Sequence, residues 1–160
     1  MTNTNPDIVS RLAAESAIHH LHATYTHRLD SGDFTGVAEL FQNGEMDIVG
    51  NIFAGYQGVL ASLEAGLQVY KDKTPRTWHT VANVLIEVDA SGDKASSASY
   101  YTVHQQVDDF PLQPICTGKY LDQFERHEGH WRFTRRAVTL RLAGDLHHHV
   151  KGANSDPQAS

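Results

Sequence analysis

Hydrophobic residues in the first half of the chain recur at the spacing of α-helices. The longest such stretch runs from about residue 6 to residue 29, with apolar residues that recur on one face at helical spacing. Its apolar face consists of Ile8, Leu12, Ile18, Leu21, Tyr25 and Leu29, and His22 falls on the same face. Asn5 can cap this helix and Pro6 suits its first position, so the sequence predicts a long amphipathic helix.

Three shorter elements follow this helix. Asp33 is placed to cap a short second helix, the segment 45–50 (EMDIVG) predicts a strand, and a third helix ends before the loop KDKTPR. The apolar residues of the second and third helices are Val37, Leu40 and Phe41, and then Leu60, Leu63, Leu67 and Tyr70.

The second half of the chain predicts an antiparallel sheet. The predicted strands cover residues 77–88, 95–107, 115–126 and 131–142. The turns SGD and HEGH separate two of the pairs, and DDFPLQP makes a longer connection between the others. Helices followed by a β-meander are typical of the α+β class. We expect residues 1–149 to form one domain and the polar segment 150–160 to be disordered.

The strand at residues 77–88 is substantially apolar on both faces. Strict alternation gives one face of Trp78, Thr80, Ala82, Val84, Ile86 and Val88, and another of His79, Val81, Asn83, Leu85 and Glu87. A strand that is apolar on both faces is expected to be covered on both. The helices can cover only one face. We therefore expect a second subunit or another partner on the other face, and a homodimer or homotrimer is the simplest arrangement.

Composition narrows the class of protein. The chain has 160 residues, 40% of them hydrophobic, which is enough for one domain with a core. A net charge of −6 argues against a nucleic-acid surface, and no apolar run approaches the roughly 20 residues that span a bilayer. The single cysteine, Cys116, excludes an internal disulfide, and the polar start MTNTNPD is unlike a signal peptide. We expect a cytoplasmic protein.

The candidate chemistry lies in a pair of residues far apart in sequence. Asp30 lies in RLDSGDF, where the long helix ends, and His79 lies in RTWHTVANVLIEV, a predicted strand. A carboxylate can fix the tautomer and orientation of a histidine, which makes that histidine a positioned general base. Taken singly, Asp30 is equally suited to capping a turn and His79 to an ordinary place in a strand.

This order of elements, with the motifs RLDSGDF, RTWH and GKYLDQFERHEGHWRFTRR, resembles the SnoaL-like branch of the nuclear transport factor 2 (NTF2-like) superfamily. The resemblance covers about residues 8–142. It implies a cystatin-like α+β cone, in which a strongly curved sheet wraps around helices and leaves a pocket at the open end. This fold hosts isomerases, dehydratases, cyclases, hydrolases and binding modules, so the residues must decide the function.

Three lyases of this branch resemble the chain at single positions: scytalone dehydratase, hexachlorocyclohexane dehydrochlorinase and bile acid 7α-dehydratase. The resemblance implies that Asp30 and His79 are their catalytic dyad. His104 falls on a second pocket histidine of scytalone dehydratase. Tyr25 matches a pocket tyrosine of the bile acid enzyme, and Arg136 matches an arginine in its last strand. His104 also has the strand parity of a plain polar residue, and Arg136 or its neighbour could pair with a surface carboxylate.

The chain departs from scytalone dehydratase at the groups that polarise the substrate carbonyl. That enzyme uses two tyrosines, where this chain has Leu29 and Ile48, and its pocket asparagine aligns with Tyr120. Scytalone is therefore not the expected substrate. If a carbonyl is activated here, another residue must do it.

These observations predict a cofactor-free lyase of the dehydratase or dehydrohalogenase type. His79, oriented by Asp30, would remove a proton from a carbon of a small hydrophobic, aromatic or alicyclic molecule, and Tyr25 or His104 would protonate the leaving oxygen. The candidate walls of the pocket are Tyr56, Trp78, Tyr100 and Tyr120. The alternatives are an isomerase or polyketide cyclase with the same dyad, and a non-catalytic module that binds a small ligand or a partner subunit.

Eleven histidines raise the question of a metal site. They include two clusters, His19, His20 and His22, and then His147, His148 and His149. The helical i, i+4 ligand spacing is absent from the first cluster, and three consecutive strand residues alternate in direction. We therefore expect neither a metal nor a cofactor.

Overall fold

The computed structural model describes residues 8–153 and has the predicted α+β class. The helices are α1 (Ile8–Asp30), α2 (Phe34–Glu39) and α3 (Gly55–Gly66). The strands are β1 (Glu45–Ile48), β2 (Asn51–Ala54), β3 (Thr77–Val88), β4 (Lys94–Val107), β5 (Phe110–His127) and β6 (His130–Ala143). No helix within the described range is long and apolar enough to cross a membrane.

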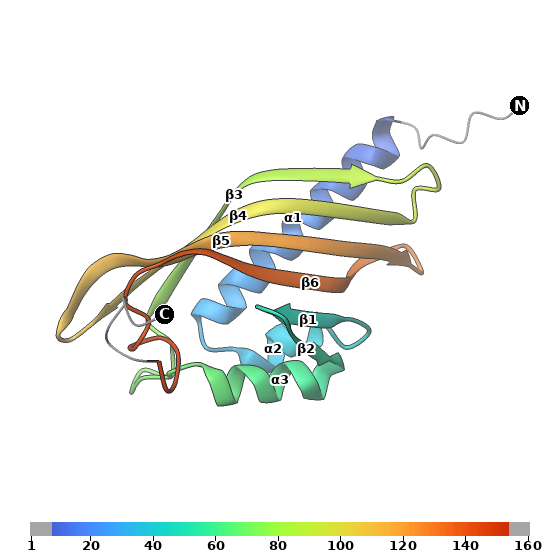
Figure 1. Ribbon diagram of the computed structural model, residues 1–160. Helices are drawn as coiled ribbons and strands as arrows, with labels where there is room; N and C mark the ends of the chain where they lie inside the picture. The colour runs from blue at the N-terminus through green and yellow to red at the C-terminus, as the bar shows by residue number, and fades with distance from the viewer. Residues whose placement is uncertain (1–7, 154–160) are drawn as a thin grey trace, which may run out of the picture.

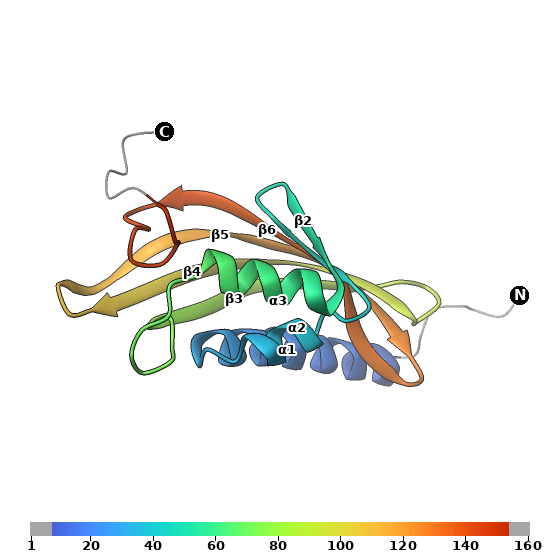
Figure 2. The ribbon, with the colours of Figure 1, turned by 90° about the horizontal axis from the view of Figure 1, so that it is seen from below.

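The strands form one curved, open sheet in the order β2-β1-β6-β5-β4-β3. β1 runs parallel to β6, and the other neighbouring strands are antiparallel. Figure 1 shows α1 lying across one face of this sheet, and Figure 2 shows α1, α2 and α3 together on that side. α1 contacts the edge strand β3 and also β6, so its C-terminal end lies beside the start of β3.

The predicted helices are present, with differences at their ends. Asp33 caps α2 as predicted, because its Oδ1 accepts a hydrogen bond from the backbone N–H of Gly36 at 2.9 Å. The predicted cap at Asn5 and Pro6 lies outside the described residues. The prediction that the third helix continues toward Tyr70 is wrong. That helix ends at Gly66, and Leu67 is already extended and forms a β-bridge with Val150.

Two features of the sheet differ from the prediction. β2 was not predicted, and it pairs with β1 through a hairpin in which Val49 and Gly50 both have positive φ. The segment DDFPLQP is not a long connection, because β5 already begins at Phe110, which pairs with Val107. Residues 150–153 belong to the described structure, so the ordered chain continues beyond residue 149.

A bulge in β3 overturns the strict alternation that the sequence predicted for this strand. The register with β4 shifts between Ala82 and Leu85, and Asn83 has a φ of 52°. The extra residue reverses the faces beyond it, so that Leu85 is exposed while Ile86 packs against the core. Before the bulge the inner face carries Thr77 and His79, as alternation requires.

The outer face of the sheet carries large exposed hydrophobic side chains. Trp78 is 69% exposed, Leu85 71%, Tyr100 48% and Leu121 45%. The strand register places Trp78 beside His104, and Leu85 and Leu121 on either side of Ala98, so these groups share one surface. An apolar surface that crosses several strands is unusual for a monomer and is typical of an interface.

We propose that a second copy of this chain covers this outer face in solution. Sedimentation at micromolar concentration is expected to show a dimer or trimer. Leu85→Glu is expected to shift the protein toward monomer, since it would bury an unpaired charge at the contact. Glu64→Gln, on the exposed surface of α3 at the other side of the sheet, serves as the control and should leave the assembly intact. A wild-type monomer at these concentrations would contradict the proposal.

Candidate active site

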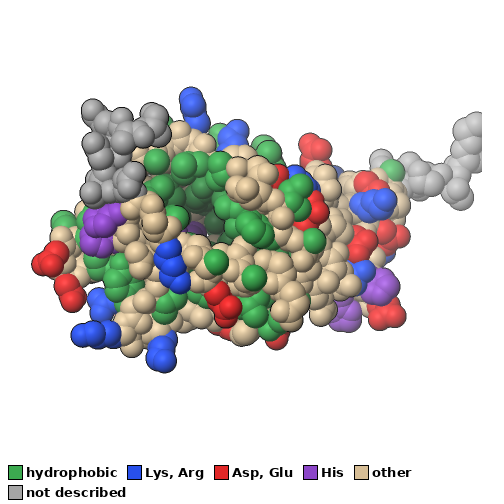
Figure 3. Space-filling view, turned by 60° about the horizontal axis from the view of Figure 1, so that its bottom comes forward, with side chains coloured by type: hydrophobic (Ala, Val, Ile, Leu, Met, Phe, Trp, Pro, Cys, Tyr) green, Lys and Arg blue, Asp and Glu red, His purple; other side chains and the backbone are tan. Residues whose placement is uncertain are grey.

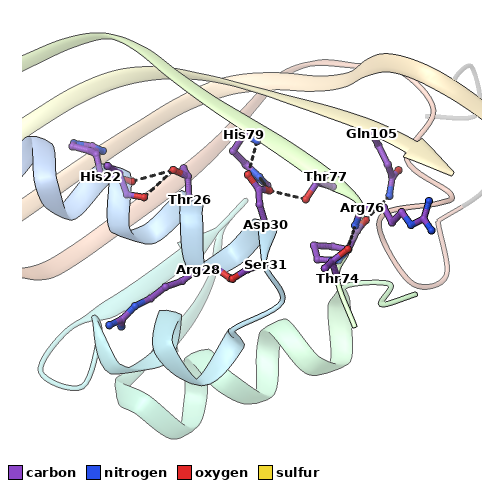
Figure 4. Close-up of polar contacts among 12 residues, drawn as sticks. His22, Thr26, Arg28, Asp30, Ser31, Thr74, Arg76, Thr77, His79 and Gln105 are labelled. Carbon is purple, nitrogen blue, oxygen red and sulfur yellow. Dashed lines mark hydrogen bonds and ion pairs between the residues drawn. The ribbon is translucent and has the colours of Figure 1, made fainter. Parts of the chain in front are cut away.

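Asp30 and His79 lie in direct contact where α1 ends against β3 (Figure 4). Nδ1 of His79 is 2.6 Å from Oδ1 of Asp30. The backbone N–H of His79 donates to the other carboxylate oxygen at 2.8 Å, and the hydroxyl of Thr77 donates to Oδ1 at 2.8 Å. Both side chains of the pair are largely buried, with 5% of His79 and 16% of Asp30 exposed. Three donors thus fix the carboxylate, and the carboxylate fixes the imidazole.

The charge state of Asp30 decides the tautomer of His79. Burial raises the pKa of Asp30, but the hydrogen bonds and charge of His79, with the hydroxyl of Thr77, outweigh it and lower that pKa below its usual value. An ionised carboxylate only accepts hydrogen bonds, so Nδ1 of His79 carries the proton. Nε2 of His79 is left with its lone pair, which is the arrangement of a general base.

A groove of about 630 Å³ runs along the dyad, between the last turns of α1 and the first half of β3. Its lining includes Thr26, Ser31 and Val81 besides the dyad itself. On the face shown in Figure 3 the surface is also hollowed, and hydrophobic side chains gather around this hollow. The groove at the dyad itself is lined mostly by polar side chains, with Trp78 and Val81 as its apolar part.

Tyr25, Tyr120 and Arg136 come together in the interior. The guanidinium carbon of Arg136 lies 4.2 Å from the ring centre of Tyr25 and 4.1 Å from that of Tyr120. Tyr120 also stacks on Tyr101, with ring centres 4.5 Å apart. Burial raises the pKa of Tyr25, and the charge of Asp30 adds to this effect against the lowering by Arg136. Tyr25 is therefore a neutral phenol at pH 7 and can donate its proton.

Two of the three guanidinium nitrogens of Arg136 are held by buried hydrogen bonds, while its Nη1 is buried without a hydrogen-bond partner among the described residues. Its Nε and Nη2 donate to the two carboxylate oxygens of Asp122, at 2.8 and 2.9 Å. Nη2 also lies 2.9 Å from Nδ1 of His22, which must accept because a guanidinium only donates. Nε2 of His22 then carries the hydrogen toward Ser97, 3.0 Å away, and Ser97 donates to Asp122. Arg135, which is partly buried, instead binds Glu45 and Asp47, so it is the arginine that pairs with acidic side chains near the surface, as the sequence predicted for one of the two.

Three of the predicted site residues lie on the wrong face of the sheet. Trp78, Tyr100 and His104 alternate with the inward-facing residues of β3 and β4, so their side chains lie on the outer face. Trp78 nevertheless lines the groove beside the dyad, as the sequence predicted. The prediction that Tyr100 and His104 contact the substrate together with His79 is corrected. Tyr56, in the first turn of α3, packs partly buried against the core.

Sequence reasoning missed several residues that shape the interior. Asp122 could have been found, because it lies between Tyr120 and Phe124 with inward strand parity, where a charge needs a partner. Thr77 has the same parity as His79. His149 had no local signal. Its ring lies 6.5 Å from that of His79, and this contact depends on the chain folding back onto the end of α3.

With this geometry in place, comparison with known families identifies the class of protein. Residues 10–137 match the model of the SnoaL-like domain, and the chain belongs to this family. The fold is accordingly the NTF2-like, cystatin-like cone. A comparison with curated proteins finds no match.

Solved structures with the same fold share about a fifth of the sequence. A variant of Rv3472 from Mycobacterium tuberculosis, a protein of unknown function, has a TM-score of 0.73 at 19% identity, over 89% of this chain and 84% of that one. A proposed scytalone dehydratase from Novosphingobium aromaticivorans has a TM-score of 0.69 at 22% identity, over 94% of this chain and 98% of that one. LinA, a hexachlorocyclohexane dehydrochlorinase, has a TM-score of 0.69 at 21% identity, over 93% of this chain and 97% of that one. At this level of identity the likeness establishes the fold.

The buried network predicts a large cost for removing its anion. Asp122→Ala leaves the guanidinium of Arg136 without a countercharge, and the free energy of unfolding is expected to fall by about 3–5 kcal/mol. Glu39→Ala, which removes an exposed partner of Arg28, should cost no more than about 1 kcal/mol. Urea unfolding of both variants measures the difference. Equal, small losses would contradict the structural role assigned to Asp122.

The buried histidines predict a loss of stability in mild acid. Burial, with the charges of Arg136 and His79 respectively, lowers the pKa of His22 and of His149 from 6.5 to about 4. Between pH 6.5 and pH 4 these two histidines bind protons in the unfolded chain but not in the folded protein. The free energy of unfolding is therefore highest above pH 6.5 and falls as the pH is lowered toward 4. We expect each histidine to account for on the order of 1–3 kcal/mol.

Urea unfolding between about pH 7 and about pH 4.5 tests this expectation. His149→Gln is expected to flatten the profile, because glutamine does not titrate. His130→Gln, on the exposed turn between β5 and β6, is the matched control. A wild-type stability that does not change across this interval would contradict the burial argument.

Proposed function

We propose that this chain is a cofactor-free lyase in which His79 abstracts a proton from a carbon next to an activating group. The hydrogen bond of 2.6 Å between Nδ1 of His79 and Asp30 is the observation that carries the proposal. It leaves Nε2 of His79 as the free lone pair and provides a countercharge for the imidazolium that forms. Membership of a family with a dehydratase and a dehydrochlorinase among its structural relatives supports the same chemistry.

The reaction is an elimination in which atoms and charges balance. The C–H bond breaks toward Nε2 of His79, its electron pair forms the new double bond, and a hydroxyl or halide leaves from the neighbouring carbon. A leaving hydroxyl takes a proton and departs as water. We assign that proton to Tyr25, which is neutral and less than two helical turns from Asp30, and the proton taken up by His79 restores the phenol of Tyr25 before the next turnover. The substrate class is a small alicyclic or aromatic molecule, for which Trp78 and Val81 provide apolar contact beside the dyad.

A panel of cyclic β-hydroxy and β-chloro ketones tests the proposal, since loss of water or chloride gives an enone with strong ultraviolet absorbance. Turnover by the wild type is expected in the presence of EDTA. His79→Asn and Asp30→Asn should each lower kcat by on the order of 10²–10⁴-fold, the first by removing the base and the second by favouring the wrong tautomer.

His104→Asn is the matched control, because His104 lies on the outer face of the sheet next to Trp78. It should leave kcat unchanged. Turnover by His79→Asn at the wild-type rate would show that His79 is not the base. Saturable binding of the ketones without any turnover by the wild type would favour the non-catalytic, ligand-binding alternative.

A further inference from the structure

The segment that follows β6 folds back over the end of α3 and is fixed there by its backbone. The carbonyl of His149 accepts from the N–H of Gln68 at 2.8 Å, and the N–H of Lys151 donates to the carbonyl of Gly66 at 2.8 Å. The carbonyl of His148 accepts from the hydroxyl of Tyr70 at 2.6 Å. The position of the segment therefore depends on its backbone, which leaves the side chain of His149 available for another task.

A buried amide holds the same segment from the sheet. Nε2 of Gln105, on β4, donates to the carbonyls of His148 and Pro75, each at 3.0 Å. Oε1 of Gln105 is itself buried and has no hydrogen-bond partner among the described residues. A buried acceptor without a partner is costly and indicates a place where a further polar group can bind.

The ring of His149 enters the interior beside the dyad. The residue is 8% exposed, and its ring lies edge-on to that of His79 with the centres 6.5 Å apart. Its Nδ1 is buried and makes no hydrogen bond within residues 8–153. His149 lies beyond residue 137, where the match to the family model ends, so the family resemblance assigns it no role.

Burial keeps the imidazole of His149 neutral, and the neighbouring charges modify this effect. Burial is the main cause, the neighbouring His79 adds to it and Asp30 opposes it, and together they lower the pKa of His149 to about 4. A neutral imidazole that is fixed in place can donate a hydrogen bond to an oxygen that gains negative charge, without giving up its proton. The chain has Leu29 and Ile48 where the related dehydratase has carbonyl-polarising tyrosines, so such a donor is needed.

We propose that His149 is the residue that binds and polarises the substrate's carbonyl oxygen, beside the base His79. This inference rests on the proposed elimination and specifies its substrate as a ketone or another carbonyl compound that passes through an enolate-like state. The N–H of His149 donates to the oxygen as the negative charge develops there. No bond to His149 forms or breaks.

Binding of para-nitrophenolate tests the inference, because its oxygen carries the charge of an enolate and its absorbance reports binding. His149→Phe keeps a ring of similar shape but removes the donor, and the Kd is expected to rise about 10- to 100-fold. His147→Asn is the matched control, since His147 lies in the same segment with a third of its side chain exposed, and its Kd should stay at the wild-type value. His149→Gln, which restores an N–H donor, should recover part of the affinity.

Nitrogen NMR of the imidazoles gives a readout that a purely structural role would not move. The His149 resonance is expected to shift when para-nitrophenolate binds to the wild type. Equal affinity for wild type and His149→Phe, no saturable binding by the wild type, or an unchanged His149 resonance would each overturn the inference. Turnover of the ketone panel by His79→Asn would instead overturn the elimination while leaving the His149-dependent binding intact, so the two failures are distinguishable.

Discussion

The fold is organised around one buried cation, the guanidinium of Arg136. It is fully buried, and such a charge is tolerated only with a countercharge and good hydrogen bonds. Asp122 from β5 supplies the charge, His22 from α1 accepts a further hydrogen bond, and the rings of Tyr25 and Tyr120 cover its faces. Two strands and the long helix therefore have one permitted arrangement around this side chain.

The docking of α1 on this cation decides where the candidate site forms. His22 and Asp30 are eight residues apart on the same helix, which is about 12 Å along the axis. Once His22 is fixed against Arg136, the end of α1 reaches the first residues of β3. Asp30 is then the last residue of the helix, where the helix dipole disfavours a carboxylate. The donors from Thr77 and His79 offset this cost, so a locally unfavourable choice of residue is retained at the place where it orients the imidazole.

The sequence was sufficient for features that depend on local patterns. The helices, the meander and the cap at Asp33 follow from periodicity and turn chemistry, and the contact between Asp30 and His79 follows from the order of elements together with a family resemblance. It was harder to predict from the sequence which face of the sheet each strand residue points to. Trp78 and His79 are neighbours on β3 and point to opposite faces of the sheet, and the bulge at Asn83 reverses the alternation beyond it. A bulge depends on the pairing with β4, which no pattern within β3 reveals.

The position of His149 was beyond sequence reasoning for a related reason, and it is the basis of the different roles proposed for His79 and His149. The three consecutive histidines resembled the end of a strand, yet long-range backbone bonds to α3 and β4 turn the last of them inward. There burial keeps the imidazole of His149 neutral, while the carboxylate of Asp30 fixes the tautomer of His79 and provides a countercharge if it gains a proton. Two imidazoles in such different environments can divide the work of a site, so that one acts as a base and the other as a hydrogen-bond donor. The dyad alone would accept a proton, and the folded-back segment adds the group that can stabilise the charge left behind.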